Sequence, residues 1–431
     1  MTVSDIMRPG ISGWRVPGGM LGTALRYGLS AAGPVAVSGA HFLASLIFLR
    51  NLPAHEFGLF SFVMVVVSFG MSLNVSLISV PITRNLVTGE TGTRAICFQM
   101  NWLVCAGFAA ALFAALLAGH APLREAVMLA LFAGVFTFRW FARCFAFVDN
   151  RMGAAVQSDI AYALLVVASL GILALAHRVN FTLGSEMMLL SALAALLPFG
   201  LKFFRTQLMA LRGDIRSYGP IFRDLTRWSL MGVFLTEVTV NAHAYLVTFI
   251  SGPSAFALLA LGMLLMRPAS LMQSALPDLE RPAMARAIAA KDMAKLSRIQ
   301  RHFRYGLAAT WAGNMLLCAA LLAFFPLLIL KKGYGLHDAI VVAAVSALIM
   351  AIRALRTPLA VLLQAAGQFK QLAGIGTLSA TISVAATLGL LLAFGPIASL
   401  GGILLGELVI LARVHTMARD WKRVHAEAWH G

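Results

Sequence analysis

Long apolar segments alternate with short polar gaps along almost the whole chain. A helix needs about 20 residues, at a rise of about 1.5 Å per residue, to cross a hydrocarbon layer of roughly 30 Å. The pattern predicts about twelve transmembrane helices, over residues 29–49, 58–80, 96–118, 126–147, 155–176, 185–204, 229–250, 254–276, 306–330, 338–364, 371–394 and 398–418. The expected fold class is therefore an all-α integral membrane protein.

Lysines and arginines are concentrated in every second gap between these segments. Of the 34 in the chain, five lie in the other gaps, at Arg50, Arg124, Arg178, Lys331 and Lys332. Because basic residues are retained on the cytoplasmic side of a membrane, this asymmetry predicts that both termini are cytoplasmic and that the number of spans is even.

The longest polar stretches, 205–228 and 277–305, both belong to the basic, inner set of gaps, and the first divides the spans into two sets of six. The fourth span carries an arginine pair, and the tenth span carries another. Such internal duplication is typical of transporters whose two halves move around a central cavity. We expect five parts: a cytoplasmic arm over 1–28, a six-helix lobe over 29–204, a basic cytoplasmic linker over 205–228, a second six-helix lobe over 229–418, and a cytoplasmic tail over 419–431.

The composition points to lipid as the main solvent of this chain. Of its 431 residues, 60% are hydrophobic and 12% are charged, with a formal net charge of +17. The basic residues are spread over the inner gaps instead of gathering with stacking aromatics, so membrane lipids and not nucleic acid are the expected partners. The cysteines have no spacing typical of a metal site or a disulfide, and no metal or other cofactor is expected. They are Cys97, Cys105, Cys144 and Cys318.

Five arginines within the spans are candidate substrate-binding residues. Arg139 and Arg353 lie too deep to reach the cytoplasm comfortably, whereas Arg143 and Arg356 lie one turn nearer to it and Arg267 is in the inner third of the eighth span. Guanidinium groups match phosphate oxygens, so these residues indicate a cavity that binds an anionic, pyrophosphorylated substrate. The alternative for Arg143, Arg267 and Arg356 is that they extend to lipid headgroups on the inner side.

Two carboxylates near the middle of their spans, Glu237 and Glu407, are candidates for cation coupling. Together they could bind Na⁺ or a proton, because hard cations prefer oxygen ligands. Hydroxyl groups of the eleventh span could assist them, at Ser379, Thr381, Ser383 and Thr387. The alternative is that each glutamate is protonated, or hydrogen-bonded to a neighbouring helix, for packing alone.

Three more polar side chains within the spans have structural interpretations. Asp159 is shallow in the fifth span and is expected to pair with Arg143 or Arg151. His41 and His243 are expected to be packed histidines with satisfied hydrogen bonds, and a role as proton carriers is the alternative.

Three short stretches resemble Wzx-type polysaccharide flippases, members of the MOP superfamily that also includes the MATE exporters and the lipid II flippase MurJ. Residues 49–60 (LRNLPAHEFGLF) resemble the junction between the first two spans of that family, and residues 252–257 resemble the opening of its eighth span. Residues 332–334, followed by 351–358 and 363–368, resemble its tenth span and the loop after it.

This resemblance implies a two-lobed, twelve-helix flippase that opens a cationic cavity alternately to each side of the bacterial cytoplasmic (inner) membrane. Its cargo would be an undecaprenyl-diphosphate-linked oligosaccharide repeat unit for O-antigen, capsule or exopolysaccharide synthesis, with a polymerase and glycosyltransferases as pathway partners. The resemblance also implies a cation site among the seventh, eleventh and twelfth spans, where Glu237 and Glu407 fall. The eleventh span has no carboxylate or asparagine to contribute.

Two other classes of protein remain as alternatives. A MATE-like, cation-coupled antiporter of drugs or metabolites is the first, although the first span lacks a carboxylate and arginines favour anions. A membrane polysaccharide polymerase or ligase is the second, although the outer gaps are too short for a catalytic domain. The lone outer pair His337–Asp338 is weak evidence for acid–base chemistry. No catalytic residue is assigned, and the chain is not expected to be an enzyme.

Overall fold

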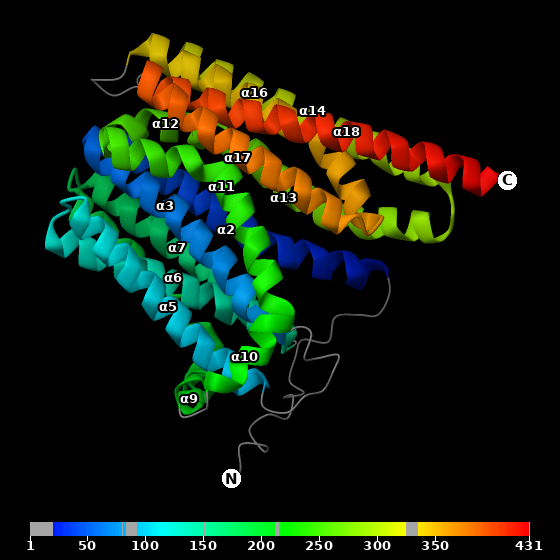
Figure 1. Cartoon of the computed structure of the whole chain (residues 1–431). Coiled ribbons are helices and arrows are strands. Elements are labelled where there is room, and N and C mark those ends of the chain that lie inside the picture. The colour runs from blue at the N-terminus through cyan, green and yellow to red at the C-terminus, as the bar shows by residue number, and fades with distance from the viewer. Residues whose placement is uncertain are drawn as a thin grey trace. The chain divides into compact units, whose positions relative to one another are not determined.

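The computed structural model of the chain describes residues 20–79, 81–82, 93–149, 151–211, 215–324 and 335–430. Regular secondary structure in these ranges is entirely helical, which confirms the expected all-α class (Figure 1). Residues 1–19 of the expected N-terminal arm lie outside the described residues. So do the outer lysines Lys331 and Lys332 and the short stretch 332–334.

The chain divides into two compact units. Unit 1 comprises Met1–Leu52 and Val63–Val233, and unit 2 comprises Pro53–Phe62 and Phe234–Gly431. The division at Val233 falls five residues beyond the linker expected over 205–228. In the structure that linker is mostly helical, because α9 (Gly200–Ala210), α10 (Tyr218–Ile221) and short 3₁₀ and π turns occupy it.

Unit 1 is built from long helices that pack side by side. They are α2 (Met20–Asn51), the later part of α3 (Ala54–Asn74), α5 (Thr93–Ala118), α6 (Leu123–Val148), α7 (Met152–Leu175) and α8 (Phe181–Ala194). Helix α6 packs against α5, α7 and α8, and α7 packs against α2 (Figure 1). Helical backbones satisfy their own hydrogen bonds, which lipid cannot do for them, so apolar sequence in a membrane folds this way.

Unit 2 has a similar construction. Its helices are the part of α11 (Arg227–Ser251) from Phe234 onward, α12 (Pro253–Leu265), α13 (Arg267–Ala289), α14 (Met293–Phe324), α16 (Leu336–Ala365), α17 (Phe369–Phe394) and α18 (Leu400–His430), together with the start of α3. Helix α18 packs against both α16 and α17, and α16 also contacts α12, α13 and α14 (Figure 1). Helices α13 and α14 occupy most of the inner stretch 277–305, which the hydropathy pattern alone left without structure.

The number of spans agrees with the prediction from hydropathy. Eleven described helices are long and apolar enough to cross a membrane, and there are twelve if one bent pair is a single span. The bent pair, Pro253–Leu265 and Arg267–Ser274, meets at 60° where the eighth span was expected. Pro268 explains the bend, because it has no amide hydrogen and its ring excludes the carbonyl of Leu264, four residues earlier.

Two of the stretches that resemble flippases meet at the beginning of α12. Gly252 precedes this helix with a φ of 87°, which glycine adopts without strain, and Pro253 occupies the first helical turn. Gly58 of α3 lies directly against the Pro253 carbonyl, so that a side chain at position 58 would overlap it. Residues from 49–60 and 252–257 are therefore in contact within unit 2.

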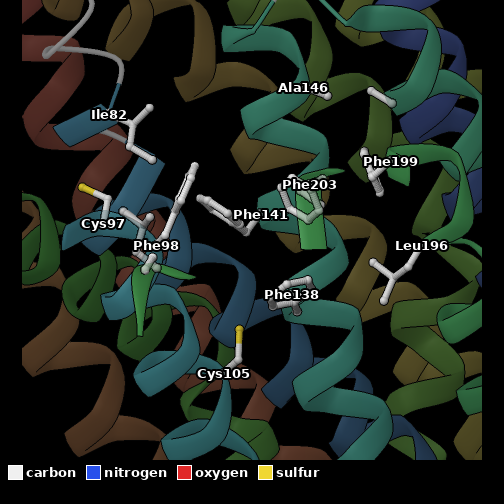
Figure 2. Packing of buried hydrophobic residues seen from close by; sticks show 14 residues of the cluster. Ile82, Cys97, Phe98, Cys105, Phe138, Phe141, Ala146, Leu196, Phe199 and Phe203 are labelled. Carbon is white, nitrogen blue, oxygen red and sulfur yellow. The ribbon is translucent and has the colours of Figure 1, made fainter. Parts of the chain in front are cut away.

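Each unit has its own apolar core. In unit 1, phenylalanines of α5, α6 and α9 gather around Phe141, including Phe98, Phe138 and Phe203 (Figure 2). Cys97 and Cys105 belong to this core, and all four cysteines are unbridged. In unit 2 the core joins α13, α14, α16 and α18 through Phe303, Leu362, Val414 and Trp421, among others.

Candidate functional site

One buried carboxylate in unit 1 is held by two arginines. Arg139 Nη1 donates to Asp159 Oδ1 at 2.8 Å, and Arg143 Nε donates to Asp159 Oδ2 at 2.7 Å. The arginines are four residues apart on α6, so they share one face of that helix, and Asp159 comes from α7. We call these three residues the first triad. The side chains of Arg139 and Asp159 are 0% and 2% exposed, so water does not reach this ion pair.

The first triad is enclosed by aromatic rings. The Arg139 guanidinium carbon lies 4.8 Å from the Phe136 ring centroid and 4.7 Å from that of Tyr162. Tyr162 is itself hydrogen-bonded, through its hydroxyl, to His41 Nε2 at 2.8 Å. Arg139 Nε and Nη2 have no hydrogen-bond partner among the described residues, so these rings replace part of the hydration of the cation. Gly33 of α2 lies against the Asp159 carboxylate on another side.

Unit 2 contains a second carboxylate held by two arginines. Arg353 Nε donates to Glu407 Oε1 at 2.7 Å, and Arg356 Nε donates to Glu407 Oε2 at 2.5 Å. The arginines lie one turn apart on α16, and Glu407 comes from α18. We call these residues the second triad. Glu407 is fully buried, but the arginine side chains are 19% and 22% exposed.

The two triads have the same net charge but different access. In each, two guanidinium groups and one carboxylate leave one positive charge in excess. A buried ion pair that loses one partner leaves a costly unpaired charge, so both triads hold their helices together. Arg353 and Arg356 are partly exposed, whereas Arg139 is fully buried.

Glu237 lies in a different environment from Glu407. It is half-buried on α11, and the Tyr245 hydroxyl, two turns along the same helix, donates to its Oε1 at 2.5 Å. Glu407 instead accepts hydrogen bonds from Arg353 and Arg356. The structure therefore gives the two carboxylates different partners, and the shared cation site expected from the sequence stays a prediction.

Three hydroxyl groups of the eleventh span, on α17, lie against α18, the helix that carries Glu407. Ser379 Oγ donates to the Gly406 carbonyl at 2.8 Å, and Ser383 and Thr387 pack against Gly406 and Gly402 of α18. Ser383 Oγ and Thr387 Oγ1 are buried without a hydrogen-bond partner among the described residues. Thr381 Oγ1 donates to the Thr377 carbonyl within its own helix. No group of three or more metal-binding side chains occurs in the described part of the chain.

The remaining predicted positions have separate surroundings. Arg267 begins α13 at the bend of the eighth span and belongs to neither triad. Asp159 pairs with Arg143 as expected, whereas Arg151 donates to the Phe199 carbonyl at 3.0 Å. The expectation of satisfied histidines is correct for His41. It is wrong for His243, which is buried with both ring nitrogens unpaired among the described residues.

Sequence reasoning missed Tyr162 and Tyr245 as partners of charged residues. Tyr162 lies three residues after Asp159, and Tyr245 lies eight residues after Glu237, so each shares a helix face with a carboxylate. Helical spacing from a buried charge is the signal that would have identified both tyrosines.

Comparison with known proteins identifies the fold. No protein-family model matches the chain, and no curated protein matches its sequence. An inward-facing multidrug resistance MATE family transporter of the MOP superfamily matches over 90% of this chain and 96% of its own, with a TM-score of 0.67 and 12% identity. An outward-facing form of such a transporter matches over 94% and 95%, with a TM-score of 0.57 and 12% identity.

A third similar structure is a MOP superfamily transporter from Pyrococcus furiosus, described as having a binding pocket of reverse polarity that suggests a different function. It covers 97% of this chain and 100% of its own, with a TM-score of 0.59 and 11% identity. These neighbours are transporters and not enzymes. The chain thus has the two-lobed helical fold of MOP superfamily transporters and is a multi-pass membrane protein.

Proposed function

We propose that this chain is a transporter of an anionic, lipid-linked substrate, and that Arg353 and Arg356 bind the anionic group. The observation that carries the proposal is the partial exposure of both arginines while Glu407 between them is fully buried. The second triad therefore presents excess positive charge in a protein with a transporter fold.

Arginine chemistry supports binding at the second triad. A guanidinium group has five N–H donors, and Arg353 uses Nε for its hydrogen bond to Glu407. Its terminal nitrogens can then form the paired contacts that phosphate oxygens accept. Glu407 keeps both guanidinium groups in place while no substrate is bound, so little reorganisation is needed when a phosphate arrives.

The first triad does not suit the same role. Arg139 is fully buried under Phe136 and Tyr162, and a substrate would have to disrupt the core of unit 1 to reach it. Arg143 is only 10% exposed at its side chain. We therefore assign Arg139 and Arg143 a structural role in place of the substrate contacts predicted from the sequence. Arg267, at the bend of the eighth span, remains a candidate contact.

The substrate that fits best is a diphosphate-linked oligosaccharide on a polyprenyl carrier. Support comes from the stretches that resemble Wzx-type flippases and from the match between guanidinium groups and phosphate. The chain would move this unit from the inner to the outer leaflet of a bacterial cytoplasmic membrane. A polymerase and glycosyltransferases of the same pathway would then be functional partners.

Reconstitution with a fluorescent diphosphate-linked glycolipid tests this proposal. The fraction of label that a membrane-impermeant quencher removes from proteoliposomes reports movement between the leaflets. We expect the double variant Arg353→Gln/Arg356→Gln to flip at least about tenfold more slowly, because two charge-assisted contacts are lost. Arg419→Gln, an exposed arginine on α18, is the matched control and should flip at the wild-type rate. An unchanged rate in the folded double variant would refute the proposal.

A cation-coupled antiporter is the second candidate, and Glu237 favours it. A half-buried carboxylate on α11 can exchange a proton or bind Na⁺, and its neighbour Tyr245 can hold the ionised form by hydrogen bonding. The same ion coupling could also drive glycolipid transport.

Glu237→Gln should abolish the dependence of transport on an ion gradient. Efflux of cationic dyes without any glycolipid movement would favour the antiporter.

A further inference from the structure

A basic pocket of about 410 Å³ lies between α14 and α18 of unit 2, apart from both triads. It is lined by Ser297, Gln300, Arg301, Arg304, Tyr305 and Lys422. Five of these residues lie three or four positions apart along α14, so they form one face of that helix. The sixth, Lys422, comes from the last part of α18. The pocket therefore depends on the packing of two helices that are distant in sequence.

The pocket is built on a buried amide. Gln300 is 2% exposed, and its Nε2 donates to the Pro358 carbonyl of α16 at 3.3 Å. Its other amide atom, Oε1, accepts a hydrogen bond from Lys422 Nζ. Gln300 thus connects three helices and holds the Lys422 ammonium at the pocket, beside the exposed arginines Arg301 and Arg304. Lys422 is therefore held at the pocket by a buried partner.

The charges of the pocket are unbalanced. Arg301, Arg304 and Lys422 contribute three positive charges, and none of the six lining residues is acidic. Asp420, two residues before Lys422, lines a different pocket and lies 3.8 Å from Arg419. Three neighbouring cations repel one another unless an anion lies between them. Hydroxyl, amide and guanidinium donors around one space are the groups that bind phosphate oxygens.

We propose that this pocket binds the phosphate of an anionic phospholipid headgroup at the inner face of the membrane. The position supports a lipid as the source of the phosphate. Both helices leave the predicted hydrocarbon layer here, and Tyr305 is 66% exposed, as expected of an aromatic residue at a membrane–water boundary. Basic pockets between transmembrane helices on the cytoplasmic side suit anionic headgroups. This inference does not depend on the proposed transport substrate.

Native mass spectrometry of the whole, delipidated protein in detergent tests the assignment. The probes are phosphatidylglycerol, neutral phosphatidylcholine and inorganic phosphate. We expect one phosphatidylglycerol molecule to be retained and phosphatidylcholine not to be retained. Arg301→Gln/Arg304→Gln should weaken phosphatidylglycerol binding by at least about tenfold, because each basic residue contributes roughly fivefold. Both substituted residues are exposed, so folding should be preserved, and adding Lys422→Gln should weaken binding further.

The triple variant Lys295→Gln/Arg298→Gln/Arg423→Gln is the matched control. It removes three exposed positive charges from the same helices, at positions outside the pocket, and should bind phosphatidylglycerol like the wild type. Equal loss in the control and pocket variants would mean diffuse surface attraction and would overturn the site. Retention of lipid by the pocket variants would overturn it as well. Displacement of the lipid by millimolar inorganic phosphate would assign the pocket to free phosphate.

Discussion

The first triad in unit 1 and the second triad in unit 2 hold one carboxylate between two arginines, yet their surroundings differ. The Arg139 guanidinium is completely buried beneath two aromatic rings, whereas Arg353 and Arg356 keep about a fifth of their side chains exposed. The same sequence pattern, two arginines one turn apart in the fourth span of each half, is therefore buried in one unit and partly exposed in the other.

The carboxylates also come from non-equivalent helices. Asp159 lies on α7, the helix that directly follows the arginine pair of α6. Glu407 lies on α18, two spans after the arginine pair of α16. The arginine pairs thus occupy equivalent spans of the two halves, but their counter-ions do not. We infer that each unit acquired its carboxylate counter-ion separately, and that this difference left the arginines buried in unit 1 and partly exposed in unit 2.

The largest effect is expected from Asp159→Asn. This substitution leaves Arg139 fully buried without a counter-ion, and breaking a buried ion pair in this way typically costs about 3 to 5 kcal/mol. The free energy of unfolding, measured by denaturant titration in detergent micelles, should fall by about that amount. A loss smaller than about 1 kcal/mol would show that the first triad does not stabilise unit 1 as described.

A smaller loss is expected from Glu407→Gln. Arg353 and Arg356 are partly exposed, so they can turn toward water, and the remaining cost is mainly that of lost charge-assisted hydrogen bonds, about 2 kcal/mol. The same titration should therefore rank Glu407→Gln below Asp159→Asn. Equal losses would contradict the difference in access between the triads.

The smallest of the three effects is expected from Gly33→Ala. A methyl group at this position would overlap the Asp159 carboxylate and push it away from its arginines, at a cost of about 1.5 kcal/mol. Gly39→Ala on the same helix is the matched control, because a side chain there meets no atom within 4 Å. The control should be neutral or stabilising by up to about 1 kcal/mol. Identical behaviour of the two variants would show that Gly33 does not confine Asp159.

Much of the fold was predictable because hydropathy is a local property. Each span can be recognised from its own apolar composition. The number of spans therefore agrees with expectation once the bent pair at Pro268 is counted as one span. Pro268 is one of several helix-breaking prolines that the sequence places inside spans, but the sequence does not give the size of the bend. Pro34 and Pro358 lie within the continuous helices α2 and α16, whereas the chain bends by 60° beside Pro268. The helical content of 277–305 was missed because polar helices leave no hydropathy signal.

The candidate site was less predictable. Sequence identified Arg139, Arg143, Arg353 and Arg356 as exceptional because charge inside a span is costly wherever it occurs. It also suggested the pairing of Asp159 with Arg143. It could not foresee that Glu407 would meet arginines and Glu237 would meet Tyr245, because partner choice depends on which helices become neighbours.

By itself, the sequence determined the helical class, the approximate positions of the spans and the helix face that each arginine pair shares. These properties follow from the apolar character of each segment and from the regular geometry of the helix. Only the tertiary structure decided which carboxylate each pair binds, which arginines stay accessible and where α14 and α18 form a basic pocket. Those outcomes arise from contacts between residues up to 122 positions apart, and their energies depend on burial that no single segment specifies.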